Sequence, residues 1–353
     1  MKFLFLGDVV LNQPFRCAPE VATLLKTHYC VANLEAPFTK EALQAPKAGV
    51  WVRSNEEFLP IFSEHIDAVT LANNHMMDYK EEGLNYTRRL LTQNGIAFCG
   101  AGGNSEEAHA PLVVGDTYIF AVCENEFGAS TKNKSGVAVY DDLRILYNNI
   151  QECKKKGTVV VCYHGGSEII PSPQTYLRER FNLLKEFGAN IIIGTHPHVV
   201  QGYEDNIFYS LGNFFFVNDG FAQYKNSDWS LAVSFDSETL ESSPIALRVE
   251  DGELRVDTSQ EHETELQKLS ELIQSPEYEN LSDTISCILH ERWYPEWVRS
   301  GELHALAHHL RCDAHANNII KGVSRYIGEY SLSPEEKYQI TLKDVDCIEI
   351  KER

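Results

Sequence analysis

The chain has 353 residues, of which 43% are hydrophobic and 23% are charged, an ordinary balance for a globular protein with a sizeable core. Its formal net charge of −20 argues against nucleic acid as a partner, because contact with a phosphate backbone requires a positive surface. No apolar run approaches the roughly 20 residues that cross a bilayer, and the N-terminal run is too short for a signal peptide, so we expect a cytoplasmic protein without a membrane segment.

Up to about residue 235, short apolar runs alternate with amphipathic stretches, which is typical of βαβ units around a largely parallel or mixed sheet. Each predicted helix is followed by glycine and then by a strand. We expect strands over residues 2–7, 28–32, 67–72, 158–163 and 190–193, and helices over 81–94, 141–156 and 174–187, closed by Gly95, Gly157 and Gly188.

After His198 the pattern changes to successive short strands joined by turn residues, which predicts an antiparallel portion or a second sheet. Residues 207–211, 230–235, 245–249 and 253–256 are the expected strands. From residue 258 the sequence becomes helical and acidic. We therefore divide the chain into a main α/β domain, residues 1–257, and an appended helical C-terminal region, residues 258–353.

Five of the predicted strands run directly into polar residues suited to metal binding. In open α/β sheets the functional crevice lies outside the carboxyl ends of the strands, so side chains at several such ends can meet at one site. The endings are Asp8, then Asn33 and Glu35, then Asn73, Asn74 and His75, then His164, and finally His196 with His198.

The histidines are the strongest of these signals. His196 and His198 stand two residues apart after a buried strand, and a strand tip can present both rings to one point. His164 closes the most apolar strand and is followed by Gly165 and Gly166, which would leave room for a ligand. A buried strand-end histidine can also be a satisfied core residue.

Two carboxylates would complete such a site. Asp8 follows Gly7, where the missing side chain would let a metal or ligand approach the backbone. Glu35 could bridge two cations about 3.5 to 4 Å apart, the spacing used in two-metal hydrolysis. Taken alone, Asp8 could equally be a turn or helix-capping residue, and Glu35 an exposed loop residue.

The segment around residue 75 suggests proton transfer. An asparagine oxygen is a neutral metal ligand, and the neighbouring His75 could protonate a leaving group. Asp78 could orient that imidazole by accepting its other N–H. The alternative for Asn73 is a turn, because Asn-Asn pairs are common there.

Five residues could face a substrate, among them Asn33 and Asn73 at the strand ends named above. Asn213 stands at another strand end and could be substrate-facing or support a ligand, while Lys47 and Arg53 lie in an extended stretch where Arg53 could clamp a phosphate or carboxylate. A solvated loop is the alternative for the two cations. No Gly-x-Ser-x-Gly motif is present, so metal-activated water is favoured over covalent catalysis.

Taken in order, these motifs resemble those of the CapA family of bacterial capsule and poly-γ-glutamate biosynthesis proteins, which is similar to the calcineurin-like metallophosphoesterases. The resemblance covers about residues 1–220 and implies a four-layer α/β/β/α sandwich with a two-metal centre. It implies that Glu35 bridges the ions and that His75 is the general acid. The implied metal ligands are Asp8, Glu35, Asn74, His164, His196 and His198.

The chain departs from the wider phosphoesterase pattern in one position. Asp8-Val9-Val10 has no histidine two residues after the aspartate, which leaves one metal short of a nitrogen donor. We expect two divalent ions, drawn from Mn, Fe, Zn and Mg, and an anionic small-molecule or polymer substrate.

The function that follows is a metal-dependent hydrolase of phosphate esters, linked to capsule or poly-γ-glutamate metabolism. Two alternatives stay open: a non-hydrolytic binding or assembly component of a γ-glutamyl polymer machinery, and a metal-dependent amide hydrolase. The oligomeric state is not indicated by the sequence.

Overall fold

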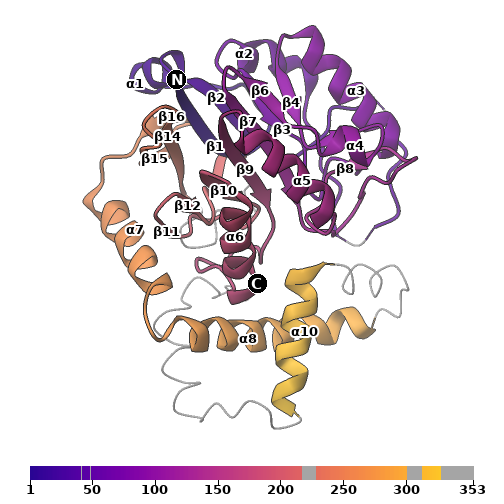
Figure 1. Cartoon of the computed structure of the whole chain (residues 1–353), viewed down its shortest axis with the longest axis vertical. Helices are drawn as coiled ribbons and strands as arrows, with labels where there is room; N and C mark the ends of the chain where they lie inside the picture. The colour runs from indigo at the N-terminus through magenta and orange to yellow at the C-terminus, as the bar shows by residue number, and fades with distance from the viewer. Residues whose placement is uncertain (41, 48, 217–227, 300–311, 327–353) are drawn as a thin grey trace.

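The fold is a four-layer α/β/β/α sandwich, as the family resemblance implied, with further helices after the last strand (Figure 1). Two sheets face each other, and helices cover their outer sides. This computed structural model describes residues 1–40, 42–47, 49–216, 228–299 and 312–326.

The first sheet has eight strands in the order β16-β15-β14-β1-β2-β3-β4, with β13 also paired to β1. Strands β1 to β4 and β13 are parallel, whereas β14, β15 and β16 are antiparallel. The predicted antiparallel portion is thus confirmed for residues 230–235, 245–249 and 253–256, which extend this sheet. The strand predicted at 207–211 is instead short, spans Ile207–Phe208 and lies parallel in the second sheet. The strands are β1 (Lys2–Val10), β2 (Tyr29–Leu34), β3 (Ala68–Thr70), β4 (Ala97–Cys99), β13 (Asn213–Phe216), β14 (Trp229–Asp236), β15 (Ser242–Glu250) and β16 (Glu253–Val256).

The second sheet has six strands in the order β11-β12-β10-β9-β7-β6. Its central strands are parallel and buried on both sides, which explains their continuous apolar sequences. The strands are β6 (Leu112–Val114), β7 (Thr117–Cys123), β9 (Thr158–His164), β10 (Ile191–Thr195), β11 (Tyr203–Glu204) and β12 (Ile207–Phe208); β5 (Ala101–Gly102) and β8 (Gly136–Val137) form a separate small pair.

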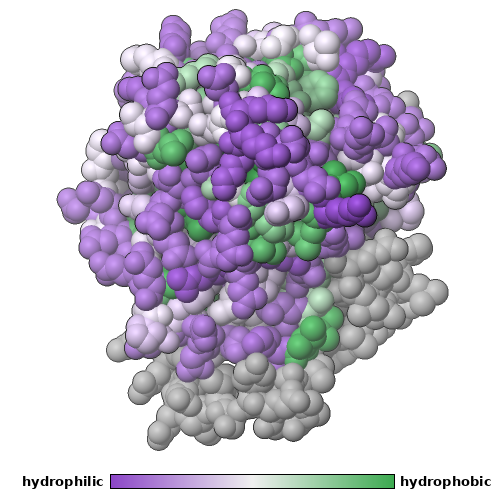
Figure 2. Space-filling view, viewed as in Figure 1, coloured by the Kyte–Doolittle hydropathy of each residue, from purple (hydrophilic) through white to green (hydrophobic). Residues whose placement is uncertain are grey.

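Alternate residues of one strand supply two different layers of the core. In β7, Ile119 and Ala121 pack in the cluster that includes the first sheet, while Phe120 and Val122 pack with α5 and α6. The face shown in Figure 2 is mostly hydrophilic. The helices of the sandwich are α1 (Pro19–Lys26), η1 (Glu56–Phe58), α2 (Leu59–Ser63), α3 (Lys80–Gln93), α4 (Ser105–Ala108), α5 (Leu143–Lys154) and α6 (Thr175–Phe187).

The three predicted helices correspond to α3, α5 and α6, and each leads into a strand as expected. Gly95 and Gly188 follow their helices with φ of 73° and 121°, which a residue with a side chain rarely adopts. Gly157 is needed for a different reason. A Cβ at that position would lie 1.9 Å from the carbonyl oxygen of Asp116.

The chain after β16 is helical, with α7 (Gln260–Ile273), α8 (Tyr278–Arg299) and α10 (Asp313–Tyr326). α7 lies against β11, where the Tyr203 backbone N–H donates to Ser270 Oγ at 3.1 Å. Within the described residues, every helix is too short or too polar to span a bilayer. The domain boundary at residue 257 stays a prediction.

A bulge at Gly7 sets the direction of Asp8. The pairing of β1 with β14 runs to Leu6, and from Asp8 onward β1 pairs with β13. The register between β1 and β2 shifts at the same point. A Cβ on Gly7 would lie 1.9 Å from the Gly212 carbonyl oxygen, so the absence of a side chain at Gly7 makes room for the backbone at Gly212. The prediction that Gly7 lets a ligand approach the backbone is therefore wrong.

We expect Gly7→Ala to lower the free energy of unfolding by about 3 kcal/mol, the upper end of overpacking costs, because Gly212 must move. Urea denaturation would measure this. Gly115→Ala is the control, since the space beside Gly115 is open and its φ of 58° adds only the left-handed penalty of about 1 kcal/mol. Equal stability of the two variants would contradict the account.

Candidate metal centre

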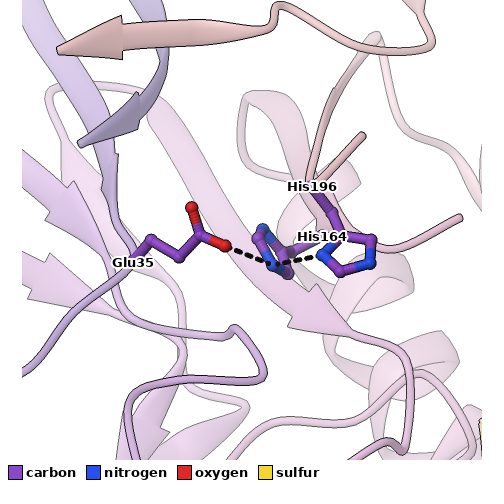
Figure 3. A group of neighbouring side chains, drawn as sticks. All are labelled: Glu35, His164 and His196. Atoms are coloured by element: carbon purple, nitrogen blue, oxygen red, sulfur yellow. Dashed lines mark hydrogen bonds and ion pairs between the residues drawn. The ribbon is translucent and has the colours of Figure 1, made fainter. Parts of the chain in front are cut away.

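The carboxyl ends of four parallel strands bring their polar residues together between the two sheets. Asp8 pairs with Asn33 across β1 and β2, and Thr195 pairs with His164 across β10 and β9. Figure 3 shows Glu35, which follows β2, pointing toward His164 and His196. The ligand candidates on these strands are all buried, although they are distant along the chain.

Two groups of side chains could each hold a metal ion. One consists of Glu35, His164 and His196, and the other of Asp8, Glu35 and His198; the ligand atoms of each group lie within 4.8 Å of one another. Glu35 belongs to both groups. Its Oε1 lies 3.7 Å from His164 Nε2 and 3.5 Å from His198 Nε2.

The Glu35 carboxylate is the least satisfied group in the centre. Both of its oxygens are buried, and neither has a hydrogen-bond partner among the residues that the structure describes. A buried carboxylate without donors is costly unless a cation compensates it. The site is therefore better suited to hold a metal ion than to form part of a protein core without one.

The pKa shifts of the carboxylates and imidazoles in the centre also favour a bound cation. Burial raises the pKa of Glu35 well above its usual value, and the neighbouring Asp8 raises it further. Burial also raises the pKa of Asp8 to about 7. It lowers the pKa of His198 to about 4 and those of His164 and His196 well below the usual value, so the three imidazoles are neutral donors suited to a cation.

Asn33 positions the ligands. Its Nδ2 donates to Asp8 Oδ1 at 2.7 Å and lies 3.1 Å from His164 Nδ1, while its Oδ1 accepts from Thr70 Oγ1 at 3.0 Å. Asp8 is held from the other side by the His196 backbone N–H at 3.0 Å. Because the amide of Asn33 is used within the protein, we propose a positioning role in place of the predicted substrate contact.

The two neighbouring asparagines differ in role. Asn74 Oδ1 lies 3.1 Å from His164 Nε2, so its amide oxygen faces the first group of ligands. Asn73 instead donates to the Leu34 carbonyl at 2.8 Å and accepts from the backbone N–H of Met76 at 2.8 Å. With its side chain fully buried, Asn73 holds the turn, which is the alternative that its sequence allowed.

His75 is oriented as the sequence suggested. Its Nδ1 lies 2.8 Å from Asp78 Oδ2, which also accepts from the Val52 backbone N–H at 2.7 Å. Lys47 forms an ion pair with Asp78, and its Nζ lies 3.2 Å from His75 Nδ1. Burial lowers the pKa of His75 despite the hydrogen bond with Asp78. Since the Lys47 side chain is only 5% exposed, we propose that it positions Asp78 rather than binding substrate.

Asn213 and Arg53, the other two predicted substrate residues, lie in different surroundings. Asn213 Oδ1 is 2.9 Å from His198 Nδ1, which leaves Nε2 of that ring turned toward Glu35. Asn213 thus sets the tautomer of a candidate ligand. Arg53 is exposed, and its contact with a substrate stays a prediction.

Asn213→Ala is expected to weaken metal binding by about 10 to 100-fold, the usual effect of removing a residue that orients a metal-bound histidine. Titration with Mn²⁺, followed by calorimetry, would measure the loss. Asn149→Ala is the matched control, because the Asn149 side chain donates to the His109 carbonyl, which lies outside the centre. Unchanged Mn²⁺ affinity in Asn213→Ala would contradict this role.

The histidine pair does not use strand geometry. Strand β10 ends at Thr195, and His196 and His198 adopt φ of 100° and 58° in the following turn. Such conformations are strained for residues with side chains and cluster at functional sites. The pair therefore stands at the tip of a buried strand as predicted, and a strained turn, not extended strand geometry, sets the direction of the two rings.

Other features of the centre were not predicted. Thr195 Oγ1 lies 3.0 Å from His164 Nδ1 and so helps to orient that ring; its place directly before His196 is the only sequence signal. Burial raises the pKa of Glu126 to about 8, and repulsion from Glu168 adds to the rise, so acidic groups lie close to one another near Asn74. Nothing in the spacing of Glu126 pointed to this.

Comparison with known proteins adds a family likeness. The family described as "Bacterial capsule synthesis protein PGA_cap" matches residues 3–218. The chain is 31% identical to the "PGA biosynthesis protein CapA" of Bacillus subtilis (strain 168) over 214 residues, which is 56% of each chain. It is 28% identical to the "Capsule biosynthesis protein CapA" of Bacillus anthracis over 262 residues, 67% of this chain and 62% of that protein. The chain thus spans less than two thirds of these relatives.

Proposed function

The chain belongs to the PGA_cap family of bacterial capsule synthesis proteins, and from this premise we propose that it is a metal-dependent hydrolase of phosphate esters. The observation that carries the proposal is the position of Glu35, which is shared by two groups of candidate ligands and has no protein hydrogen-bond partner among the described residues. A carboxylate in this position suits the bridge of a two-metal centre.

The residues present fit a pair of divalent cations. His164, His196 and Asn74 would hold one ion, Asp8 and His198 the other, and Glu35 both. Bound divalent cations supply an activated water and stabilise negative charge on a phosphoryl oxygen. The mixed nitrogen and oxygen donors are compatible with Mn, Fe, Zn or Mg.

Protein side chains would supply the proton and the charge balance that the reaction also needs. His75 would hold a proton for the leaving group, with Asp78 keeping the ring in place through Nδ1. Lys47 would keep the charge of Asp78 balanced in this buried position. The net charge of −20 makes the cations the main source of attraction for an anionic substrate, either a small molecule or a polymer.

The test is an assay of purified protein with p-nitrophenyl phosphate in the presence of Mn, Fe, Zn or Mg. We expect turnover with at least one of these metals and none after treatment with a chelator. A protein that binds metal and yet shows no turnover with any of them would contradict the proposal.

A second candidate function is a non-hydrolytic component of γ-glutamyl polymer assembly. The names of the two relatives favour it, since one refers to PGA biosynthesis and the other to capsule biosynthesis. Here the cations would hold a carboxylate-rich chain. Retained metal without turnover, together with affinity for polyglutamate, would support this candidate over the hydrolase.

The same centre could also cleave an amide, and the relatives' names make γ-linked glutamate the substrate to test. Release of free glutamate from γ-linked oligomers, with no turnover of aryl phosphates, would favour this reaction. We rank it below phosphate ester hydrolysis, because paired divalent ions are the usual means of stabilising both oxygens of an in-line phosphoryl displacement.

A further inference from the structure

A buried carboxylate outside the metal centre joins three parts of the chain. Glu124 directly follows β7 and is only 4% exposed. Its Oε1 accepts from the backbone N–H of Gly166 at 3.2 Å and from the Tyr176 hydroxyl at 2.7 Å. Its Oε2 accepts from the Ala314 backbone N–H at 3.2 Å and lies 3.4 Å from Cys312 Sγ. The groups around it are donors, so both carboxylate oxygens have hydrogen-bond partners.

The two glycines after His164 fit this arrangement. A Cβ on Gly165 would lie 2.5 Å from Glu124 Cγ, so the glycine makes room for that side chain. Gly166 has a φ of 108° and donates its N–H to the carboxylate. The prediction that the glycines leave space for a ligand is therefore wrong, because Glu124 fills the space beside Gly165 and the side chains of Leu177 and Pro197 lie beside Gly166.

A second polar contact holds the same loop eight residues further on. Gln174 Oε1 accepts from Ser167 Oγ at 2.8 Å, and its Nε2 donates to Ser286 Oγ of α8 at 3.0 Å and to Asn318 Oδ1 of α10 at 2.7 Å. All four side chains are buried. One glutamine thus ties the loop after His164 to both C-terminal helices.

Apolar packing completes the contact. Ile170 is 2% exposed and packs against Leu281, Ile285 and Leu289 of α8. The Tyr278 hydroxyl donates to the Pro173 carbonyl at 2.8 Å. Within residues 165–174, which connect the His164 strand to α6, the C-terminal helices contact Ile170, Pro173 and Gln174 directly. They reach Gly166 and Ser167 only through Glu124 and Gln174.

We propose that α8 and α10 are a positioning part of the metal centre, with Glu124 and Gln174 transmitting the docking of these helices to the loop that follows His164. This inference rests on the proposed metal centre. It goes beyond it, because the helices lie outside the matched residues 3–218 and, among their described side chains, contribute none of the candidate ligands.

The proposal makes metal binding and helix docking reciprocal. If a docked α10 favours the metal-binding position of the loop, bound metal must favour docked α10 by the same factor. Loss of the Glu124 or Gln174 contacts should then weaken metal binding, and metal should slow hydrogen exchange at the start of α10. Neither residue touches the candidate ligand atoms, so a purely structural role predicts neither effect.

The experiment uses the full chain with Mn²⁺ alone as the probe. Mn²⁺ affinity and hydrogen exchange over residues 165–174 and 313–318 are measured for the wild type, Glu124→Gln and Asn318→Ala. We expect Mn²⁺ to slow exchange in both segments of the wild type, and each variant to bind Mn²⁺ about tenfold more weakly, with faster exchange in the loop. Asp283→Asn is the control, since it removes only an α8–α10 ion pair with Lys321 and should change Mn²⁺ affinity less than twofold.

The outcomes separate the two claims. A wild type that binds no Mn²⁺ would overturn the proposed metal centre and the coupling with it. A wild type that binds Mn²⁺ without slower exchange in α10, or folded variants with wild-type affinity, would overturn the coupling alone. If Glu124→Gln fails to fold, the Mn²⁺ affinity of Asn318→Ala and the hydrogen exchange of the wild type still test the coupling.

Discussion

Glu35→Gln is expected to abolish hydrolysis of p-nitrophenyl phosphate and to remove most of the bound metal. Glutamine keeps the size of the side chain but loses the negative charge that both groups of ligands share. If the bound metals stabilise the transition state by several kcal/mol, their loss corresponds to at least a ~10³-fold fall in kcat/KM. Metal analysis and steady-state kinetics on the same preparation would measure both effects.

The control for Glu35→Gln is Asp257→Asn. Asp257 is also a buried carboxylate in contact with a histidine, His262, but it lies in the loop before α7 and outside both groups of candidate ligands. We expect this variant to keep its metal and its activity. Full metal content and activity in Glu35→Gln would contradict the bridging role.

His75→Gln is expected to separate proton transfer from metal binding. A general acid contributes about 10² to 10⁴-fold, and its loss matters most when the leaving group is a poor one. Turnover of phenyl phosphate should therefore fall by about that factor, while p-nitrophenyl phosphate, whose leaving group needs little protonation, should be affected far less. Metal content should stay unchanged, since His75 belongs to neither group of ligands.

A matched control for this variant is His28→Gln, because His28 contacts the Leu24 carbonyl and Ser234 away from the centre. Equal losses on the two aryl phosphates would argue that His75 acts by positioning instead of by donating a proton. A large loss of metal in His75→Gln would argue that the ring is a ligand.

Individual strands and helices were predictable from the sequence because they follow local rules, whereas the four-layer arrangement was implied by the family resemblance. The apolar run at 158–163 and the helix at 174–187 were placed to within a residue or two, as β9 and α6 show. His164 also lies at the end of its strand as expected. Parallel strands then bring their carboxyl ends to one edge whatever the details of the loops.

The predictions that were wrong concern residues whose surroundings depend on contacts between distant segments of the chain. The position of Lys47 showed a cation in a stretch predicted to be extended, but its burial against Asp78 depends on Ala45 and Val52, which also contact Asp78. The bulge at Gly7 similarly depends on Gly212, more than two hundred residues later. Gly165 was misjudged for the same reason, since Glu124 comes from another strand.

The sequence also did not predict the contacts that the C-terminal helices make. Gln174, Ser286 and Asn318 are unremarkable polar residues in their own helices or beside them, and only the tertiary structure brings them together. The predicted boundary at residue 257 separates segments that share buried hydrogen bonds with the loop after His164. A composition change marks where helices begin, but it does not show what they contact.

The most direct test of the two-metal centre is anomalous X-ray diffraction from crystals soaked in Mn²⁺. The account predicts two peaks, about 3.5 to 4 Å apart, on either side of the Glu35 carboxylate. One peak would be bounded by His164 and His196, and the other by Asp8 and His198. Fully soaked crystals with no peak at Glu35, or with Mn²⁺ bound only elsewhere, would contradict the central claim.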